Sequence, residues 1–360
     1  MDTQRKINLA VIGTGYWGPN LVRSFNDDSR VVLKMICDLD KTRAMNVAAK
    51  YRDVETTNNI EEVLQRTDID AVAICTPTNT HFDIARRAME AGKHVFIEKP
   101  LATTSAECEA LIQLAQKRRR KLMVGHVFLF NPAVQYVKGL IDREELGDIT
   151  YIYGVRVNLG PIRKDVDALW DLAPHDIAIF NYWLNSAPVY AHATGIQSLN
   201  PPLHDVVFVT LKYPKNIMAS LHVGWLDPRK QRQITVVGTK RMVVFDDLDP
   251  VGPVHIYDKT VTRPQSSKAV TDNIQAFKQV VQEGDLVIPK IPSAEPLKNE
   301  CRGFIDWLIE DKAPVSDGKN GLDVVRVLEA ATLSLSHSGI ETSIDAPIAR
   351  ERRLPIEAAA

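Results

Sequence analysis

The chain has little cysteine, no long apolar run and almost no net charge. Only four of its 360 residues are cysteines, and their spacing matches neither a zinc site nor a disulfide framework. The formal net charge of −1 gives no overall attraction to nucleic acid or anionic lipid. No apolar segment is long enough to span a bilayer, and the N-terminal residues lead into a strand without a signal-peptide pattern. These absences predict a cytoplasmic protein without a metal, nucleic-acid or membrane site.

The remaining composition is that of an ordinary globular protein, and its length suggests two domains. Apolar runs at 7–13, 31–38, 71–76, 94–100 and 122–128 alternate with helical patterns, which predicts a parallel sheet covered on both faces. Near residue 126 this alternation gives way to strands joined by short turns. We therefore predict an α/β, doubly wound Rossmann domain over 1–126 and an α+β domain over 127–360.

Three glycines separate the first strand from the helix that follows it, in the stretch GTGYWG. Gly13, Gly15 and Gly18 have the G-x-G-x-x-G spacing of a dinucleotide-binding turn. Gly13 permits the tight turn, Gly15 lets a pyrophosphate approach the backbone, and Gly18 lets helix and strand pack closely. The helix N-terminus then offers unpaired N–H groups to the phosphates. The pattern predicts a bound dinucleotide.

A carboxylate at the end of the second strand strengthens this prediction. Asp38 follows Gly18 at the distance where an acid binds the adenosine ribose hydroxyls. Asp38 and Asp40 would repel a ribose 2′-phosphate, so NAD is favoured over NADP, while Lys41 and Arg43 moderate the preference. The alternative is that Asp38 only caps the next helix.

Polar residues follow the later strands, at the edge where a doubly wound sheet binds ligands. They lie in CTPTNTH (75–81), EKP (98–100) and GHVFLFNP (125–132). Lys99 at this edge would hydrogen-bond the reacting oxygen and help to relay its proton. The alternative is an ordinary exposed lysine. His126 would either face the substrate or pack beneath a nicotinamide.

The stretch WDLAPHD (170–176) opens a helix expected over about 172–185. Asp171 and His175 are four residues apart and would share a helical face. Pro174 fits only in the first turn, which would place His175 near the positive end of the helix dipole and favour the neutral imidazole that a base needs. Asp171 would favour the imidazolium formed after proton transfer. The alternative is that Asp171 is a helix cap and His175 a packed surface residue.

The ordered set GTGYWG, TPTNTH, EKPL, GHVFLFNPA and Asp171-x-x-x-His175 resembles the glucose–fructose oxidoreductase and inositol dehydrogenase family, known as Gfo/Idh/MocA. The resemblance covers essentially the whole chain. It implies that Lys99 and His175 are the catalytic pair, with Asp171 as a third member, and that the Lys99–Pro100 bond is cis. It also implies a C-terminal domain for substrate binding, with a large open antiparallel sheet that would form a homodimer or homotetramer.

The resemblance assigns further residues to the cofactor and the substrate. The expected cofactor contacts are Gly13, Gly15, Tyr16, Trp17, Gly18, Asp38, Thr76, Pro77, Asn79, His81, Glu98, Lys99 and His126. Glu98 would contact the nicotinamide ribose, whereas His81 has the alternative of being only a helix-start residue. The segment 156–176 resembles the subgroup that oxidises UDP-N-acetylglucosamine or its uronate at C3. Arg156, Asn158 and Arg163 would then join Lys99, Asp171 and His175 in binding substrate, or would be solvated.

Three functions follow from these residues. The leading one is an NAD-dependent dehydrogenase that moves a hydride between nicotinamide and a ring carbinol of a nucleotide sugar. The second keeps this chemistry but uses a free cyclitol or monosaccharide. The third is a regulator that binds NAD or a sugar without turnover, which the presence of Lys99, Asp171 and His175 disfavours because a sensor needs no proton relay.

Overall fold

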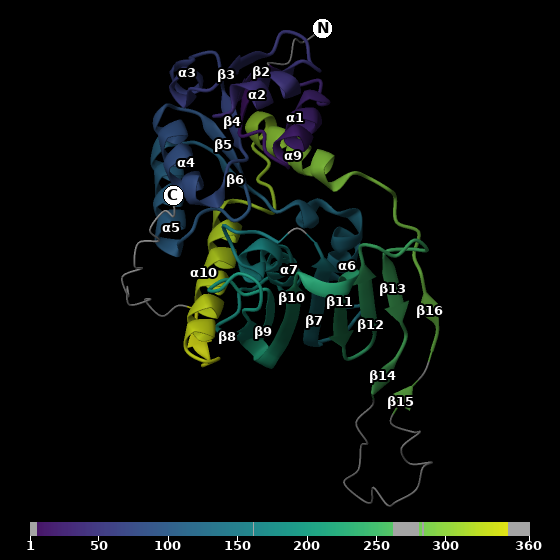
Figure 1. Cartoon of the computed structure of the whole chain (residues 1–360). Coiled ribbons are helices and arrows are strands. Elements are labelled where there is room, and N and C mark those ends of the chain that lie inside the picture. The colour runs from purple at the N-terminus through teal and green to yellow at the C-terminus, as the bar shows by residue number, and fades with distance from the viewer. Residues whose placement is uncertain (1–5, 161, 262–280, 283, 345–360) are drawn as a thin grey trace, which may run out of the picture.

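The computed structural model describes residues 6–160, 162–261, 281–282 and 284–344, and the first part of the chain forms a parallel sheet between helices (Figure 1). Its six strands lie in the order β3-β2-β1-β4-β5-β6. The strands are β1 (Ile7–Ile12), β2 (Val31–Cys37), β3 (Glu55–Thr57), β4 (Ala71–Ile74), β5 (His94–Glu98) and β6 (Leu122–Gly125). Between them lie α1 (Gly18–Asn26), α2 (Lys41–Ala48), α3 (Ile60–Gln65), η1 (Thr78–Thr80), α4 (His81–Glu90) and α5 (Ser105–Arg118).

Residues of β1 alternate between two apolar cores, one on each face of the sheet. Leu9 and Val11 belong to one core, and Ala10 and Ile12 belong to the other. Burial on both faces explains why these strands read as continuous apolar runs. The predicted doubly wound fold is confirmed, and its strand order reverses between β1 and β4. Ligands of such sheets bind beyond the carboxyl ends of the strands at this reversal.

The second part of the chain forms a nine-stranded sheet in the order β16-β13-β12-β11-β7-β10-β9-β8-β17. Its strands are β7 (Ile149–Leu159), β8 (Tyr190–Ile196), β9 (Val206–Tyr213), β10 (Ile217–Gly224), β11 (Leu226–Gly238), β12 (Met242–Asp246), β13 (Val254–Tyr257), β16 (Leu286–Val287) and β17 (Thr342–Ser343). A separate pair joins β14 (Thr260–Val261) to β15 (Val281–Gln282).

The sequence predicts an antiparallel sheet here, but the sheet is mixed, because one pair of neighbouring strands is parallel. The turn η3 (Pro214–Asn216) joins β9 to β10 as an antiparallel pair, as the short connection predicts. On its other side, however, β10 runs parallel to β7, with Leu221 opposite Gly154. The reason is that β7 and β10 are not consecutive, since α7, β8 and β9 lie between them in the chain.

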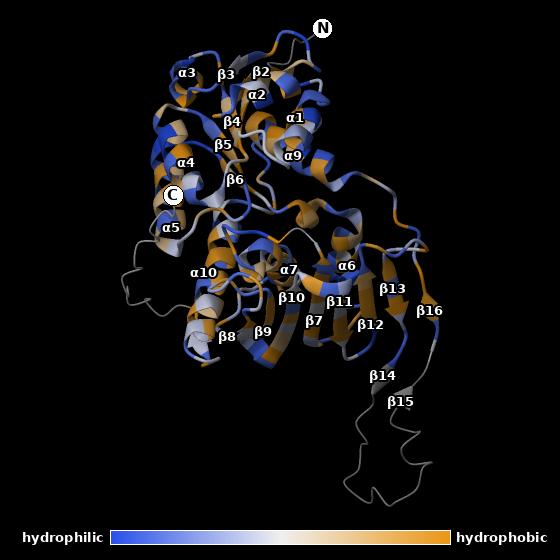
Figure 2. Cartoon of the chain, in the orientation of Figure 1, coloured by the Kyte–Doolittle hydropathy of each residue, from blue (hydrophilic) through white to orange (hydrophobic). Residues whose placement is uncertain are grey.

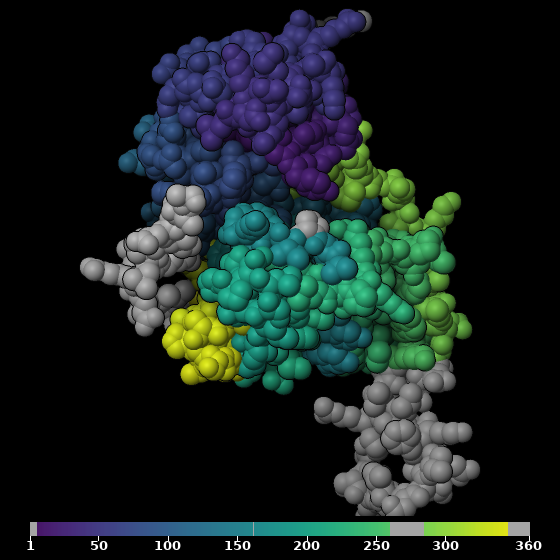
Figure 3. Space-filling view, viewed as in Figure 1, coloured from purple at the N-terminus to yellow at the C-terminus, as the bar shows by residue number. Residues whose placement is uncertain are grey.

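Among the described residues, four helices and a short turn complete the fold and join the two sheets. They are η2 (Val127–Phe130), α6 (Pro132–Asp142), α7 (Ala168–Leu184), α9 (Pro296–Glu310) and α10 (Gly318–Ser336). The end of the chain returns to the first sheet, because α9 packs on α1 while α10 packs on α5, α7 and β8. Figure 3 shows the N-terminal residues as one lobe, the teal and green residues as another, and the light-green α9 segment against the first lobe. None of the described helices is long and apolar enough to cross a membrane.

Candidate active site

The glycine turn after β1 has the shape that a pyrophosphate requires. Gly13 has φ = +95°, and a Cβ there would lie 2.6 Å from the carbonyl oxygen of Cys75. A Cβ on Gly18 would collide with the carbonyl oxygen of Gly13. A Cβ on Gly15 would meet nothing within 4 Å, so this glycine faces open space. Two glycines thus form the turn and the third leaves room for a ligand, which fits a dinucleotide.

Asp38 organises this turn, a role that its spacing alone did not reveal. Its Oδ2 accepts hydrogen bonds from Thr14 N at 2.6 Å and Thr14 Oγ1 at 2.7 Å, and its Oδ1 accepts one from Asp40 N at 2.9 Å. Burial opposes ionisation, but these bonds outweigh it and lower the pKa of Asp38. Asp40, rather than Asp38, caps the next helix by accepting from Arg43 N.

The charges around Asp38 fit NAD better than NADP. The Arg43 guanidinium lies 4.0 Å from the Asp38 carboxylate and 3.7 Å from that of Asp40. A ribose 2′-phosphate would need the positive charge of Arg43, but the carboxylates of Asp38 and Asp40 offset that charge. Tyr16 is almost fully exposed, whereas Trp17 packs against the core at the start of α1.

The segment after β4 divides into exposed residues and a buried histidine. Pro77 and Asn79 are exposed, and Thr76 is half-buried. His81 is buried, with Nδ1 2.9 Å from the carbonyl oxygen of Pro100 and Nε2 2.9 Å from that of Thr76. These contacts fit the alternative of a residue that holds the start of α4, and its cofactor contact stays a prediction.

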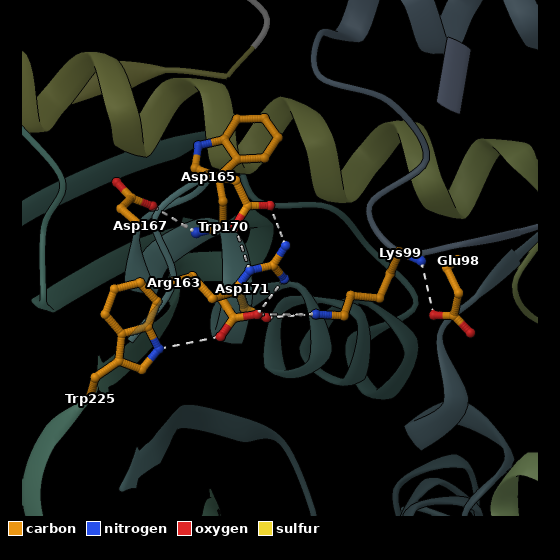
Figure 4. A network of polar contacts seen from close by, with 8 residues as sticks. All are labelled: Glu98, Lys99, Arg163, Asp165, Asp167, Trp170, Asp171 and Trp225. Carbon is orange, nitrogen blue, oxygen red and sulfur yellow. Dashed lines mark hydrogen bonds and ion pairs between the residues drawn. The ribbon is translucent and has the colours of Figure 1, made fainter. Parts of the chain in front are cut away.

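Lys99 reaches across from the first sheet to α7 (Figure 4). It precedes Pro100 through a cis peptide bond, as the resemblance implies. Its Nζ donates to the carbonyl oxygen of Asp171 at 2.7 Å and lies 3.9 Å from the Asp171 carboxylate. Burial lowers the pKa of Lys99, and the nearby carboxylates of Asp171 and Glu98 oppose this shift. Lys99 is thus a partly buried cation at the edge where ligands bind.

The start of α7 differs from the prediction, with consequences for the site. The helix begins at Ala168, and Asp167 caps it by accepting from Trp170 N at 3.0 Å. Pro174 is therefore inside the helix and not in its first turn, which corrects the expected start near residue 172. Proline has no N–H for the carbonyl four residues before it, so the helix is weakened beside the carbonyl that accepts from Lys99. Asp171 is not the helix cap.

The Asp171 carboxylate is the centre of a small polar network (Figure 4). It accepts from Arg163 Nη1 at 3.1 Å and from Trp225 Nε1 at 3.3 Å. Arg163 also donates to Asp165 from Nε at 3.0 Å and from Nη2 at 2.5 Å. Neither Asp165 nor Trp225 was predicted as a site residue, because an acid in a loop and a tryptophan after β10 carry no recognisable spacing. The predicted substrate residue Arg163 is here paired with two acids.

His175 is half-buried close to Lys99, and its environment keeps the imidazole neutral. Burial, and then the cations of Lys99 and Arg156, hold the pKa of His175 well below its ordinary value. The helix N-terminus is not the cause, since His175 is in the second turn of α7. The Asp171 carboxylate contacts Lys99, Arg163 and Trp225, so its support of an imidazolium at His175 stays a prediction.

Aromatic and imidazole rings surround His175. Phe128 contacts it edge-to-face with ring centroids 5.1 Å apart. His126 is buried, and neither of its ring nitrogens has a hydrogen-bond partner among the described residues. Burial and the charge of Lys99 lower the pKa of His126 to about 3. His126 therefore lies in the site as a neutral ring. Whether it faces the substrate or packs beneath the nicotinamide stays a prediction.

Arg156 forms a buried ion pair with Asp176, and this pairing argues against its predicted contact with substrate. Its Nε and Nη2 donate to the two carboxylate oxygens of Asp176 at 2.5 and 3.0 Å, and both side chains are buried. Its guanidinium also lies 4.5 Å from the ring centroid of Phe128. The arginine fork is thus used to hold β7 against α7. Asn158 lies two residues further along β7 and is half-buried.

This geometry agrees with what comparison with known proteins finds. The model of the oxidoreductase family with an NAD-binding Rossmann fold matches residues 7–126, and that of the GFO/IDH/MocA C-terminal domain matches residues 134–244. The chain belongs to the Gfo/Idh/MocA family. It is therefore an oxidoreductase with an NAD-binding domain, and the glycine turn and Asp38 are residues that fit this cofactor.

Curated relatives in the Gfo/Idh/MocA family act on different substrates. UDP-N-acetylglucosamine 3-dehydrogenase of Acidithiobacillus ferrooxidans is 29% identical over 254 residues, which cover 70% of this chain and 77% of that protein. Inositol 2-dehydrogenase of Salmonella typhimurium is 28% identical over 184 residues, which cover 50% of this chain and 55% of that protein. Family membership therefore leaves the substrate undecided.

Solved structures support the Gfo/Idh/MocA fold over nearly the whole chain. The structure of the Acidithiobacillus ferrooxidans 3-dehydrogenase has a TM-score of 0.77 at 24% identity and covers 92% of this chain and 98% of that one. The structure of GenD2 from gentamicin A biosynthesis, in complex with NAD, has a TM-score of 0.78 at 22% identity, with coverage of 95% and 97%. At these identities the likeness concerns the fold.

Proposed function

We propose that this oxidoreductase oxidises a ring CH–OH group of a nucleotide sugar of the UDP-N-acetylglucosamine type, at C3, with Lys99 and His175 as its proton relay. The observation that carries the proposal is a neutral, half-buried imidazole at His175 beside the partly buried ammonium of Lys99. Bound NAD supplies the hydride acceptor. The two side chains then have complementary tasks at one substrate hydroxyl.

Each task follows from the environment of the side chain. His175 is held neutral by burial and nearby cations, so it has a free lone pair for the hydroxyl proton. Lys99 donates hydrogen bonds from an ammonium and stabilises the negative charge that develops on the substrate oxygen. Asp171 orients this ammonium through its backbone carbonyl and carboxylate. We assign Asp171 a positioning role.

The nucleotide-sugar class is supported by a cation near the relay and by a relative whose match covers 70% of this chain. Arg163 is the more exposed partner in its ion pair with Asp171, and its guanidinium can exchange a carboxylate for an anionic substrate group. The match to UDP-N-acetylglucosamine 3-dehydrogenase extends over 70% of this chain. A free cyclitol is the second candidate, favoured by the match to inositol 2-dehydrogenase.

The test follows NADH absorbance after mixing purified protein and NAD with one sugar at a time. We expect a rise with UDP-N-acetylglucosamine or its uronate, and none with myo-inositol or glucose. A rise only with the free polyols would overturn the substrate class and leave the relay standing. Tight NAD binding without turnover on any of the four would instead support a regulator.

We also propose that the chain forms a homodimer or homotetramer through the outer face of the nine-stranded sheet. Alternate residues on this face are large and exposed by 39–51%, namely Tyr151, Tyr153, Phe208 and Met218. They lie on neighbouring strands, with Met218 opposite Tyr151. Figure 2 shows apolar and polar residues alternating along these strands, as expected for a sheet with one buried face. Large exposed side chains that gather on one face of a sheet are typical of a surface that associates with a partner.

The variant Phe208→Glu places a charge on this outer face and should dissociate the oligomer. Light scattering after size exclusion is expected to show a 40.2 kDa species for the variant and a multiple of that mass for the wild type. Lys117→Glu, an exposed change on α5, is the matched control and should keep the wild-type mass. A wild type that is itself 40.2 kDa at high concentration would refute the interface.

A further inference from the structure

A cavity of about 570 Å³ lies at the amino ends of the parallel strands, on the opposite edge of the sheet from the glycine turn. It is lined by His94, the first residue of β5, and by Arg120, two residues before β6. The apolar side chains of Ile7, Leu64 and Leu308 also line it. Doubly wound sheets bind their cofactors at the carboxyl ends of the strands, so this cavity is separate from that site.

The ring of His94 is held in one tautomer by the backbone. Its Nδ1 accepts a hydrogen bond from Lys121 N at 3.0 Å. Burial, and then the charges of Arg120 and Lys121, lower the pKa of His94 to about 4, so the ring is neutral at pH 7. A neutral imidazole whose Nδ1 accepts carries its proton on Nε2, so Nε2 is a donor.

Two donors therefore face each other at this cavity. Arg120 Nη1 lies 3.3 Å from His94 Nε2, and an arginine nitrogen can only donate. Neither nitrogen has an acceptor among the residues that the structure describes. One oxygen about 2.9 Å from both nitrogens would accept from each of them. The pair thus has the geometry to bind an oxygen that the described residues do not supply.

The charges that line the cavity favour an anion. Arg66 is paired with two acids that do not line the cavity, and the buried ammonium of Lys93 is opposed by Asp70, an acid in the lining. Arg120 forms no ion pair within the described ranges, and its Nε donates to the carbonyl oxygen of Arg118. Arg120 is therefore the cation of the lining whose charge no described acid offsets.

Exposed cations next to Arg120 add to this attraction. Lys117, Arg118 and Arg119 precede it at the end of α5, and none of the three forms an ion pair among the described residues. Such a run raises the local concentration of anions beside the cavity.

We propose that His94 and Arg120 bind the carboxylate or phosphate group of a small molecule, in a ligand site separate from the cofactor edge. One oxygen of this group accepts from His94 Nε2 and Arg120 Nη1, and a second accepts from Nη2 of the arginine fork. The rest of the molecule lies against the apolar side chains. Because Leu308 belongs to α9, the ligand contacts both the first sheet and the helix that returns to it.

Nitrogen-15 NMR of the histidine rings tests the site on the full-length protein, and His94→Gln identifies the His94 resonances. Without ligand, His94 should have a protonated Nε2 and an unprotonated Nδ1. Inorganic phosphate or citrate, added at pH 7 and constant ionic strength, should shift His94 Nε2 along a saturating curve. A response to phosphate alone assigns a phosphorylated ligand, and a response to citrate alone assigns a carboxylate. A protonated Nδ1, or no saturable shift with either anion, would overturn the site.

Two variants connect the response to Arg120. Arg120→Met removes the charge and the facing donor, so the dissociation constant of the responding anion should rise by at least about tenfold. Arg118→Met loses the same charge at an exposed position of α5 and should stay within about twofold of wild type. Phosphate bound at the glycine turn, on the other edge of the sheet, would not produce this difference. Equal constants for Arg120→Met and wild type would refute the proposal.

Discussion

Replacing His175 with alanine is expected to lower kcat by about 100- to 10,000-fold, because the substrate hydroxyl loses its base. Lys99→Ala should lower kcat within the same range, because the developing oxyanion loses its ammonium. In both variants the NAD dissociation constant should stay within about threefold of wild type, since the glycine turn and Asp38 are untouched. Steady-state kinetics and calorimetry measure the two quantities on the same preparations.

Matched controls and a pH profile separate this role from general damage. His337→Ala and Lys240→Ala remove the same side chains at exposed positions and should retain wild-type kcat. Because the pKa of His175 is lowered well below 6.5, the kcat of the wild type should begin to fall only at a pH below 6.5, where His175 becomes protonated. The charge of Lys99 lowers the pKa of His175, and Lys99→Met removes this charge. The residual kcat of this variant should therefore begin to fall at a higher pH than that of the wild type. Full activity of either alanine variant at the relay would exclude the proposed pair.

Replacing Gly13 with alanine should destabilise the fold, whereas replacing Gly15 with alanine should leave its stability nearly unchanged. At Gly13 the left-handed φ costs about 1–3 kcal/mol, and the new Cβ would lie 2.6 Å from the Cys75 carbonyl, so the protein should be destabilised. At Gly15 the new methyl group meets nothing within 4 Å, so the free energy of unfolding should change by less than about 1 kcal/mol. Chemical denaturation measures both values.

NAD binding completes the contrast between these glycines. The methyl group of Gly15→Ala occupies the space through which a pyrophosphate approaches the backbone, so the NAD dissociation constant should rise by about 10- to 100-fold. Gly92→Ala is a control away from the turn, because Gly92 has φ = +81° with open space around it and tests strain alone. Wild-type NAD affinity in Gly15→Ala would mean that phosphate does not bind over this turn.

The first sheet was predictable because its signals are local. Each buried parallel strand is a short apolar run, and the glycine turn needs only residues 13–18 and one acid in the following unit. The start of α7 was less predictable. The sequence Asp165-Val166-Asp167 offers two acids before the helix, and Pro174 suggests a late start, yet Asp167 is the cap and the proline is internal. Tertiary packing of α7 outweighs the local cost of that proline.

The sequence alone determined the family, the cofactor and the residues at the strand ends, because motif spacing and the alternation of strands with helices are local features. Only the tertiary structure decided which groups these residues contact. Arg156 is bound to Asp176, His81 to two carbonyls, and Asp171 to Lys99 and Arg163. The helix α9 packs on α1 only because the chain returns to the first lobe near its end. The physical reason is that hydrogen bonds and charges act through space at a few ångströms, whatever the separation along the chain.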